Sequence, residues 1–380
     1  MCDVLTGNTP SRQQPQFFGE GTPWLTPRDI ADEIYVYEGI ESITQLGIDY
    51  ARAQILPKGT VLLVCIGATV GKVAIAGRLL CVNQQINALI CGNEIFPEYL
   101  YYWLKFRRKH ITELASVATL PIINQTILKE FSILLPSVPE QRRIAARIQE
   151  LMEDVHRARA ACEKQLEAAH TLPAAYLHEV FESKEAKSWE RKKLRHVCEI
   201  DGCPLLPDKA EARDLPYIGL EHIESGSGKI IGQVVDREGS IIKSISYKFD
   251  KRHVLYGKLR PYLNKVATPE FVGRCSTELV PFLPKEGCNR EFLAMLLRRP
   301  ETVEEAMINK TGTRMPRADI AKMLELRIPF PSFNEQVRIS AWLKKLIFEI
   351  DKAQDAFLRQ LKDIEALPNS VLLNTFRGNL

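Results

Sequence analysis

Apolar residues recur at steps of four and three along two long stretches of the chain. In residues 137–182 they fall at Ile144, Ile148, Leu151, Val155, Ala158, Cys162 and Leu166, and in residues 332–377 at Ile339, Leu343, Leu346, Ile350, Ala353, Phe357 and Leu361. A stripe this narrow is typical of a coiled-coil seam, although an ordinary core helix can also show it. Two copies of one seam favour pairing with each other. A helix of about 30 residues would span roughly 45 Å, so the pair would act as a spacer.

The two stretches align without a gap. The alignment pairs Glu140-Gln141 with Glu335-Gln336, and Leu172-Pro173 with Leu367-Pro368. A serine stands three residues before the glutamate in each copy, at Ser137 and Ser332. This spacing predicts a capping box, in which the hydroxyl accepts from the amide three residues on and the carboxylate reaches back to the cap amide. We expect the Leu-Pro pair to mark the end of each rod, because an interior proline removes a helical hydrogen bond.

The segments that precede the two helices also repeat. A shift of 193 positions aligns Pro23-Trp24-Leu25 with Pro216-Tyr217-Ile218 and Glu98-Tyr99-Leu100 with Glu291-Phe292-Leu293, and a shift of 195 aligns Pro121 with Pro316. The chain is therefore a tandem duplication: globular domain 1–136, helix 137–183, globular domain 184–331 and helix 332–380. The segment Trp189–Leu194 has no counterpart, so either the first domain lacks that element or the tail Thr375–Leu380 packs beside it.

These patterns predict an α+β fold. Two globular mixed α/β domains are separated by two long antiparallel helices that form a coiled coil, with pseudo-two-fold symmetry. Within the first domain we expect strands at Thr60–Ile66, Lys72–Ala76 and Ile86–Ile90, a helix at Pro97–Lys109, and a strand or extended segment at Ile127–Leu135.

Charge is distributed unevenly between the two domains. The net charge of the 380-residue chain is only +4, which by itself does not identify a nucleic-acid partner. Residues 1–136 hold 11 basic and 12 acidic residues, whereas residues 189–330 hold 25 and 20. If both domains bind a polyanion, the first must use a local patch. The nine cysteines form no C-x-x-C pair, and we interpret them as reduced thiols of a cytosolic protein. We expect no signal peptide and no membrane span, because no run of about 18 apolar residues occurs.

The sequence motifs of several enzyme classes do not match this chain. Gly67–Val73 resembles a phosphate-binding loop, but it is one residue short and has Val73 where Ser or Thr should bind magnesium. Phe17–Gly21 resembles a methyl-donor loop but is followed by Thr22-Pro23-Trp24. The chain has no Asn/Asp-Pro-Pro-aromatic stretch, no nucleophile elbow and no histidine spacing suited to a metal. The sequence therefore gives little support to an enzyme.

One family has this combination of motifs and repeats. The helix starts EQRRIAARI and EQVRISAWL each follow a Pro-Ser pair, and Gly7-Asn-Thr-Pro10, Pro23–Leu25 and Gly67–Val73 precede the first. With these motifs and its alternation of domains and helices, the chain resembles the specificity (S) subunit of type I restriction-modification enzymes. The missing start of the first domain is the departure from that pattern.

The resemblance implies a non-catalytic, sequence-specific DNA-binding subunit in the cytoplasm of a bacterium or archaeon. Each target-recognition domain would read one half of a bipartite double-stranded DNA target, and the helices would set the half-site spacing. The helices would also dock two modification (methyltransferase) subunits, and restriction subunits would then join. S-adenosylmethionine, ATP and magnesium are expected on those partners, with no metal or cofactor on this chain.

Candidate contact residues follow from the same comparison of repeats. Arg or Lys suits guanine, and Asn or Gln suits adenine, on loops that reach a groove. The DNA-binding candidates are Thr69, Lys72, Asn83, Gln84, Gln85, Asn87, Thr119, Asn124, Lys258, Arg260, Asn264, Lys265, Arg274, Ser276, Thr277, Thr313, Arg314 and Arg317. The seam and docking candidates are Ile144, Ile148, Leu151, Val155, Leu166, Ile339, Trp342, Leu343, Leu346, Ile347, Phe348, Ile350 and Leu361. For any single DNA candidate, a solvated or turn-forming polar loop is the alternative.

A second function is also consistent with the sequence. The chain could be a degenerate relative that docks methyltransferase subunits as a scaffold without reading DNA. The charge balance of −1 on residues 1–136 and the missing start favour this alternative.

Overall fold

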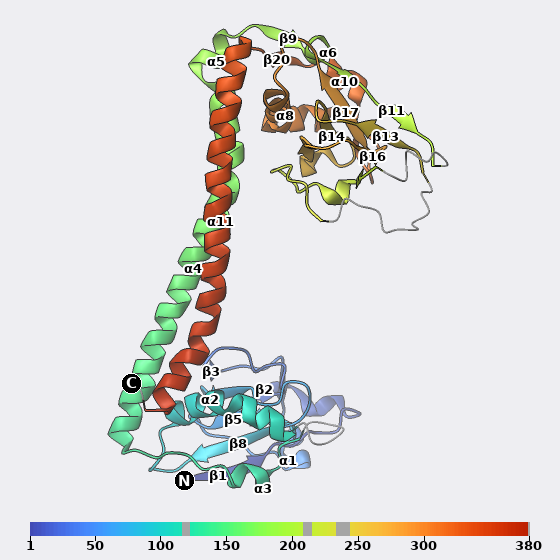
Figure 1. Ribbon diagram of the computed structural model, residues 1–380. Helices are drawn as coiled ribbons and strands as arrows, with labels where there is room; N and C mark the ends of the chain where they lie inside the picture. The colour runs from blue at the N-terminus through green and yellow to red at the C-terminus, as the bar shows by residue number, and fades with distance from the viewer. Residues whose placement is uncertain (116–121, 208–214, 233–243, 379–380) are drawn as a thin grey trace. The chain divides into compact units, whose positions relative to one another are not determined.

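The computed structural model describes all residues except 116–121, 208–214, 233–243 and 379–380 (Figure 1). The chain forms two compact units, one of residues 1–162 with 360–380 and one of residues 163–359. We call them unit 1 and unit 2. Each contains one globular domain and a portion of each long helix.

Unit 1 is built on a five-stranded sheet. Its order is β1 (Cys2–Thr6), β8 (Ile86–Cys91), β5 (Val61–Val64), β6 (Val73–Ala76) and β3 (Tyr35–Val36), so the three predicted strands are confirmed. Every residue of β5 and β6 is buried, because both faces of the sheet are covered. Val61 and Leu63 pack toward α2 (Pro97–Ala115), while Leu62 and Val64 pack with Leu25 into a separate core. Alternation of side chains along a strand explains this division.

A smaller sheet and short helices complete the first domain. The sheet has the order β4 (Glu41–Ile43), β2 (Phe18–Leu25) and β7 (Cys81–Val82), and η1 (Pro15–Phe17) and α1 (Gln45–Ala51) lie beside it. The prediction of a strand or extended segment over residues 127–135 is wrong at its start. Asn124 caps a helix there, α3 (Gln125–Lys129), by accepting from the Ile127 amide at 2.8 Å.

Unit 2 repeats the main sheet of unit 1. One sheet has the order β10 (Cys198–Ile200), β17 (Leu279–Pro284), β14 (Val254–Gly257) and β15 (Val266–Ala267). The other has the order β11 (Cys203–Leu205), β13 (Ser246–Phe249), β16 (Gly273–Ser276) and β12 (Tyr217–Ile218). The order β10-β17-β14-β15 matches β1-β8-β5-β6. In two further two-stranded sheets, β18 (Lys310–Thr311) pairs with β19 (Arg317–Ala318) and β20 (Arg327–Pro329) pairs with β9 (Arg191–Lys193).

One helix of unit 1 becomes two helices in unit 2. The place of α2 is taken by α8 (Arg290–Arg298) and α9 (Pro300–Ile308). Pro300 lacks an amide proton and restricts the residue before it, and Arg299 is extended with ψ 139°. The other short helices in the described part of unit 2 are α5 (Lys184–Ser188), α6 (Leu194–Val197), η2 (Leu220–His222), η3 (Pro261–Leu263) and α10 (Ile320–Leu324).

The long helices are α4 (Val138–Glu182) and α11 (Phe333–Phe376), and neither ends at its Leu-Pro pair. The prediction that Leu172-Pro173 and Leu367-Pro368 end the rods is therefore wrong. Pro173 leaves the Ala169 carbonyl without its helical donor. The Gln354 side chain of α11 donates to that oxygen at 3.0 Å, so tertiary contact replaces the missing bond.

The two helices run side by side in opposite directions within each unit (Figure 1). In unit 2, Gln354 bonds Ala169 and Trp342 packs edge-on against Tyr176 at 6.2 Å. In unit 1, Arg159 lies 3.9 Å from Glu365. Rising residue numbers on α4 thus meet falling numbers on α11. The predicted antiparallel direction holds within each unit.

The predicted caps form only in part. The Ser332 hydroxyl accepts from the Glu335 amide at 3.4 Å, as a capping box requires. The Glu140 and Glu335 carboxylates instead bind Arg143 and Arg338, the arginine three residues on in each helix. These arginines lie on the same face of the helix and compete with the cap amide for the carboxylate.

A buried glutamine ties each long helix to the domain that precedes it. Gln141 is fully buried: its side-chain oxygen accepts from Phe96 N at 2.8 Å, and its nitrogen donates to the carbonyls of Glu94 and Pro136 at 2.9 Å each. The second copy is Gln336, which accepts from Asn289 N at 2.8 Å and donates to Gly287 and Pro331 at 3.1 and 2.9 Å. The repeated Glu-Gln motif is thus a structural clamp.

The far end of each helix packs on the other globular domain. In unit 2, Phe181 of α4 lies 5.5 Å from Phe292, ring to ring. In unit 1, Phe376 of α11 lies 5.5 Å from Tyr99, the residue that corresponds to Phe292. Each domain is therefore completed by the helix that follows the other domain in sequence. Within the described parts of the chain, no helix is long and apolar enough to cross a bilayer.

Candidate nucleic-acid interface

A polar cavity of about 690 Å³ opens on the first domain. Its lining comes from three regions of the chain: Thr9, Arg12, Trp24, Thr26–Asp29, Ile40 and Glu41; Ile66–Thr69; and Asn83–Gln85. The cavity therefore gathers predicted contact residues from the loops after β5 and β7 beside residues that sequence reasoning missed.

Arg12 is the most constrained cation of this cavity. Its two terminal nitrogens donate to the two carboxylate oxygens of Glu41 at 2.7 Å each. The guanidinium carbon lies 5.0 Å from the Phe18 ring and 5.5 Å from the Trp24 ring. The bond to Arg12 lowers the pKa of Glu41, so the carboxylate stays charged at neutral pH. A bidentate pair on aromatic rings keeps the guanidinium plane in one orientation.

The predicted residues of the first domain divide into exposed and internal groups. Gln84 is exposed and bonds the Thr9 hydroxyl, and Thr69 and Gln85 are half-buried on the cavity wall. Asn83 is 5% exposed and donates to Gln85 at 3.0 Å. Three others lie elsewhere: Asn87 is buried and accepts from Thr6, Lys72 donates to the Ile30 carbonyl, and Asn124 caps α3. Thr119 is outside the described residues.

The second domain presents a more basic surface at the matching place. Lys258 and Thr277 are half-buried, and Arg260, Thr313 and Arg314 are exposed. Arg317 binds Glu278 through Nε and Nη2, with the shortest contact at 2.8 Å. The isolated bridge of Leu259 with Arg317 corresponds to that of Ile66 with Ile122 in the first domain. These residues therefore occupy the region that corresponds to the cavity of the first domain.

Four other predicted residues of the second domain are tied to that domain by hydrogen bonds or a ring contact. Asn264 donates to the Arg298 carbonyl at 2.8 Å, and Lys265 donates to the Leu220 carbonyl at 2.7 Å. Arg274 is 3% exposed and stacks over Tyr217 at 4.7 Å. The Ser276 hydroxyl accepts from the Glu278 amide at 3.2 Å. Lys265 and its counterpart Lys72 make the same kind of bond to a backbone carbonyl, which indicates a structural role for both.

The turn after β5 and its counterpart after β14 share an uncommon backbone conformation. Gly67 and Gly71 have φ of +97° and +85°, and their counterparts Arg260 and Asn264 have φ of +52° and +48°. A left-handed conformation costs a residue with a side chain about 1 to 2 kcal/mol, whereas glycine adopts it freely. Arg260 therefore places a cation where the fold itself favours glycine, and strain of this kind is commonly found at functional sites.

Sequence reasoning missed the densest basic stretch of the first domain. Four of its basic residues, Lys105, Arg107, Arg108 and Lys109, lie together on α2. Burial lowers the pKa of Lys105, whereas Arg108 and Lys109 are exposed. Arg108 also packs against the turn at Gly71, since a Cβ built there would lie 2.9 Å from its Cγ. This stretch is a local basic patch of the kind that the first domain would need if it binds a polyanion.

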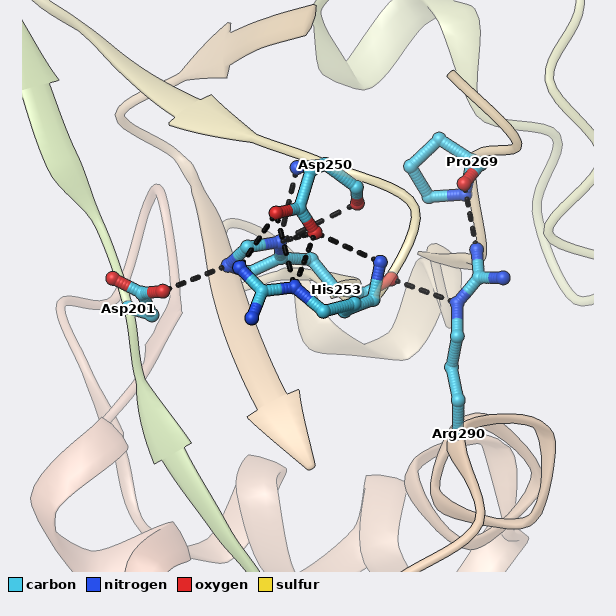
Figure 2. A network of polar contacts seen from close by, with 6 residues as sticks. Asp201, Asp250, His253, Pro269 and Arg290 are labelled. Carbon is cyan, nitrogen blue, oxygen red and sulfur yellow. Dashed lines mark hydrogen bonds and ion pairs between the residues drawn. The ribbon is translucent and has the colours of Figure 1, made fainter. Parts of the chain in front are cut away.

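A histidine network in the second domain supports the turn before β14. Figure 2 shows His253 between Asp201 and Asp250, with Arg290 reaching the same turn. His253 Nε2 lies 3.3 Å from Asp201, and its Nδ1 accepts from the Asp250 amide at 3.0 Å. Arg290 donates to the carbonyls of His253 and Pro269 at 3.2 and 2.7 Å. Because these contacts hold the turn to residues that follow β10 and β15 and to the start of α8, we assign the network to stability. No cluster of three or more potential metal ligands occurs among the residues described.

Cysteines offer no reactive site in the cores. Burial raises the pKa of the Cys65, Cys198, Cys275 and Cys288 thiols to about 12. A thiol with so high a pKa is protonated at neutral pH and is a poor nucleophile.

The seam candidates differ in burial along the helices. Ile148, Ile339, Leu343 and Ile350 are buried, and Ile144, Leu151, Val155, Leu166, Leu346, Ile347 and Leu361 are half-buried. Trp342 and Phe348 are 49% and 57% exposed. Trp342 also lines a groove of about 390 Å³ with Val180, Trp189 and Ile339 in unit 2. The exposed aromatic residues lie beside the seam, not in it.

The chain matches a protein family over most of its length. A family model described as the type I restriction modification DNA specificity domain matches residues 1–165 and 186–360. The type I restriction enzyme MjaIX specificity subunit of Methanocaldococcus jannaschii is 28% identical over 245 residues, 59% of this chain and 56% of that protein. The EcoDI specificity subunit of Escherichia coli is 26% identical over 319 residues, 75% and 70% of the two chains. The match thus spans little more than half of the MjaIX subunit.

Two solved structures share the fold. One, from a study of complex assembly and conformational transition of the type I R-M system, has a TM-score of 0.71 at 18% identity and covers 100% of this chain and 96% of that one. The HsdS subunit of Thermoanaerobacter tengcongensis has a TM-score of 0.68 at 19% identity and covers 100% and 95%. The predicted fold class is confirmed by these full-length matches.

Proposed function

The chain belongs to the type I restriction-modification DNA specificity family, and from that premise we propose that it is the non-catalytic subunit that reads DNA for such an enzyme. Each globular domain would read one half of a bipartite duplex target, and α4 and α11 would set the distance between the halves. Half-sites on one side of a duplex lie about 34 to 36 Å apart or at a multiple of that spacing.

The observation that supports DNA reading best is Arg260. It is an exposed cation in a left-handed conformation, at the position where the first domain has Gly67. The fold alone gives no reason for an arginine there, whereas a phosphate or a guanine edge does. In the first domain, Arg108 and Lys109 are suited to phosphates, beside the turn that lines the polar cavity.

Partner subunits would carry out the catalytic reactions. The chain would dock two modification (methyltransferase) subunits, which carry S-adenosylmethionine, and restriction subunits that use ATP and magnesium. Trp342, Ile347 and Phe348 form the apolar face that we assign to modification-subunit docking. Such a complex would work in the cytoplasm of its bacterial or archaeal host.

Arg260→Gly tests the assignment without disturbing the fold. Glycine suits the conformation, so the variant should be at least as stable as the wild type, while its complex should bind target duplex about 10-fold more weakly. Lys258→Glu with Arg260→Glu should weaken binding further and reduce its salt dependence. Fluorescence anisotropy across a salt series measures both effects. Lys322→Glu with Arg327→Glu, exposed basic residues of α10 and β20, is the matched control.

Selection from randomised duplexes separates DNA reading from the scaffold alternative. The purified complex should enrich two half-sites at a constant separation, and methylation mapping in the host with and without this chain should find the same pair. A complex that assembles but enriches no motif would support the scaffold. Unchanged DNA affinity in the Lys258 and Arg260 variants would instead refute the assignment of these residues as DNA contacts, without contradicting the proposed function.

A further inference from the structure

We propose that Arg12 and Arg317 are guanine-reading residues, one on each domain, each oriented by a glutamate. This inference rests on the proposed function and adds which base each residue would contact, and through which edge of the base. Arg12 is paired with Glu41, and Arg317 with Glu278. Arg12 is absent from the predicted contact residues, and its glutamate lies 29 positions along the chain.

Each pair leaves part of the guanidinium free to donate. A guanidinium carries five N–H donors in a planar fork. Glu41 accepts from Nη1 and Nη2 of Arg12, which leaves the Nε edge open. Glu278 accepts from Nε and Nη2 of Arg317, which leaves the terminal edge, with only a 3.5 Å contact from Nη1 to the Met315 carbonyl. Two parallel donors remain in each case, and guanine offers N7 and O6 as the matching acceptors.

The glutamates argue for a base and against a phosphate. An arginine that neutralises phosphate acts through its net charge, and a bound carboxylate cancels that charge and repels the anion. A base edge carries no net charge, so it does not repel the glutamate of the pair as a phosphate would. The carboxylate instead limits rotation of the long side chain, and the rings of Phe18 and Trp24 hold the Arg12 plane from its face. Less rotamer freedom is then lost when DNA binds.

Both pairs lie on the predicted reading surfaces. Arg12 and Glu41 line the 690 Å³ cavity with Gln84, a residue type that pairs with adenine. Glu278 occupies the position that corresponds to Gln85 of that cavity, and Arg317 corresponds to Ile122, the bridge partner of cavity residue Ile66. The arginine side chains are 57% and 39% exposed, so their free edges can be reached from solvent.

A third pair serves as the matched control. Arg78 binds Glu38 in the same domain as Arg12, with side chains 53% and 67% exposed. Neither residue lines the cavity, and the structure gives Arg78 no aromatic contact among the described residues. A surface pair of this kind contributes little to stability. Arg78→Ala therefore removes an arginine–glutamate pair without touching the proposed reader.

The experiment compares enriched motifs from the assembled complex. With Arg12→Ala, one G·C position should become degenerate in one half-site, affinity for the original target should fall about 10-fold to 100-fold, and the other half-site should be unchanged. Arg317→Ala should do the same in the other half. Glu41→Gln should weaken the same G·C preference as Arg12→Ala, and Arg78→Ala should change nothing.

Two results would overturn the inference. One is a wild-type motif that survives at every position in both Arg12→Ala and Arg317→Ala. The other is an affinity loss that is equal for all sequences and comes with a shallower salt dependence, which is the signature of a phosphate contact. Thermal unfolding of each variant shows whether the domain is intact. A wild-type complex that enriches no motif would refute the proposed function before these variants are compared.

Discussion

Unit 1 and unit 2 share the contacts that join helix to domain, but not the side chains on their reading surfaces. Gln141 and Gln336 make the same three hydrogen bonds to corresponding backbone atoms. Gly67 of the first surface corresponds to Arg260 of the second, and Gln85 corresponds to Glu278. The difference shows which positions of the duplicated fold tolerate change. Buried backbone groups must keep their partners, whereas exposed loop positions are free to diverge and to recognise two different half-sites.

The glutamine clamp gives the largest expected effect and tests whether the two units are equivalent. Gln141→Leu and Gln336→Leu each leave one backbone amide and two backbone carbonyls without their side-chain partner, at a position where the glutamine itself is fully buried. Each should lower the free energy of unfolding of its own unit by about 2 to 4 kcal/mol. Urea unfolding with hydrogen exchange measures this unit by unit. Gln149→Leu, at an exposed position of α4, is the control. A loss below about 0.5 kcal/mol would show that the clamp is dispensable.

The next prediction concerns partner assembly, has a smaller expected effect and distinguishes α11 from α4. Trp342 and Phe348 of α11 correspond to Arg147 and Glu153 of α4, so only α11 has this exposed aromatic pair. Trp342→Ser with Phe348→Ser should weaken assembly with the modification subunit more than about 10-fold, because buried aromatic residues dominate interface energies. The thermal midpoint of the free chain should change little. Co-purification and titration measure assembly, with Arg147→Ser as the control. Undiminished assembly would remove this face from the proposed interface.

The smallest expected effect is the pH dependence that Asp250 gives to the stability of unit 2. Hydrogen bonds from the Arg252 side chain hold the pKa of Asp250 below its usual value, and nearby positive charge adds to this. The corresponding turn of unit 1, Pro57–Gly59, has no carboxylate. A lowered folded-state pKa contributes stability that is present above the unfolded value of about 4 and is lost as the pH falls through the folded value.

Asp250→Asn should therefore destabilise unit 2 at pH 7, and the difference from wild type should shrink as the pH falls below about 4. Urea unfolding between pH 3 and pH 7 measures the difference, with unit 1 as the internal reference. A difference that stays constant across this range would show that the Asp250 charge contributes nothing.

Sequence reasoning succeeded for elements whose signals are local. The buried runs around Val61 and Ile86 form strands, and the stretch from Pro97 forms a helix, because burial on both faces and a starting proline act within a few residues. It failed where a distant partner decides. Pro173 does not end α4, and the carbonyl that the proline leaves free accepts from Gln354, 185 positions away. Residues 127–129 are helical because Asn124 caps them.

The candidate interface was predicted as a region but not residue by residue. Polar residues near the strand ends mark the two surfaces, yet Asn87 and Arg274 point into the domains, where Thr6 and Tyr217 meet them. Composition cannot tell an exposed amide from a buried one that has a partner. The pair of Arg12 and Glu41 carries no local signal, because its members meet only after β2 and β4 have been placed beside each other.

The sequence by itself determined that this chain is a duplication of a domain and a long seam-bearing helix, because both repeat and periodicity are properties of spacing along the chain. Tertiary structure alone decided which helix completes which domain. Phe181 packs on Phe292 of the second domain, and Phe376 packs on Tyr99 of the first. Period and spacing place an apolar residue at the end of each helix. Only the folded chain brings it to its domain, which for Phe376 lies near the opposite end of the sequence, because burial rewards contact irrespective of sequence separation.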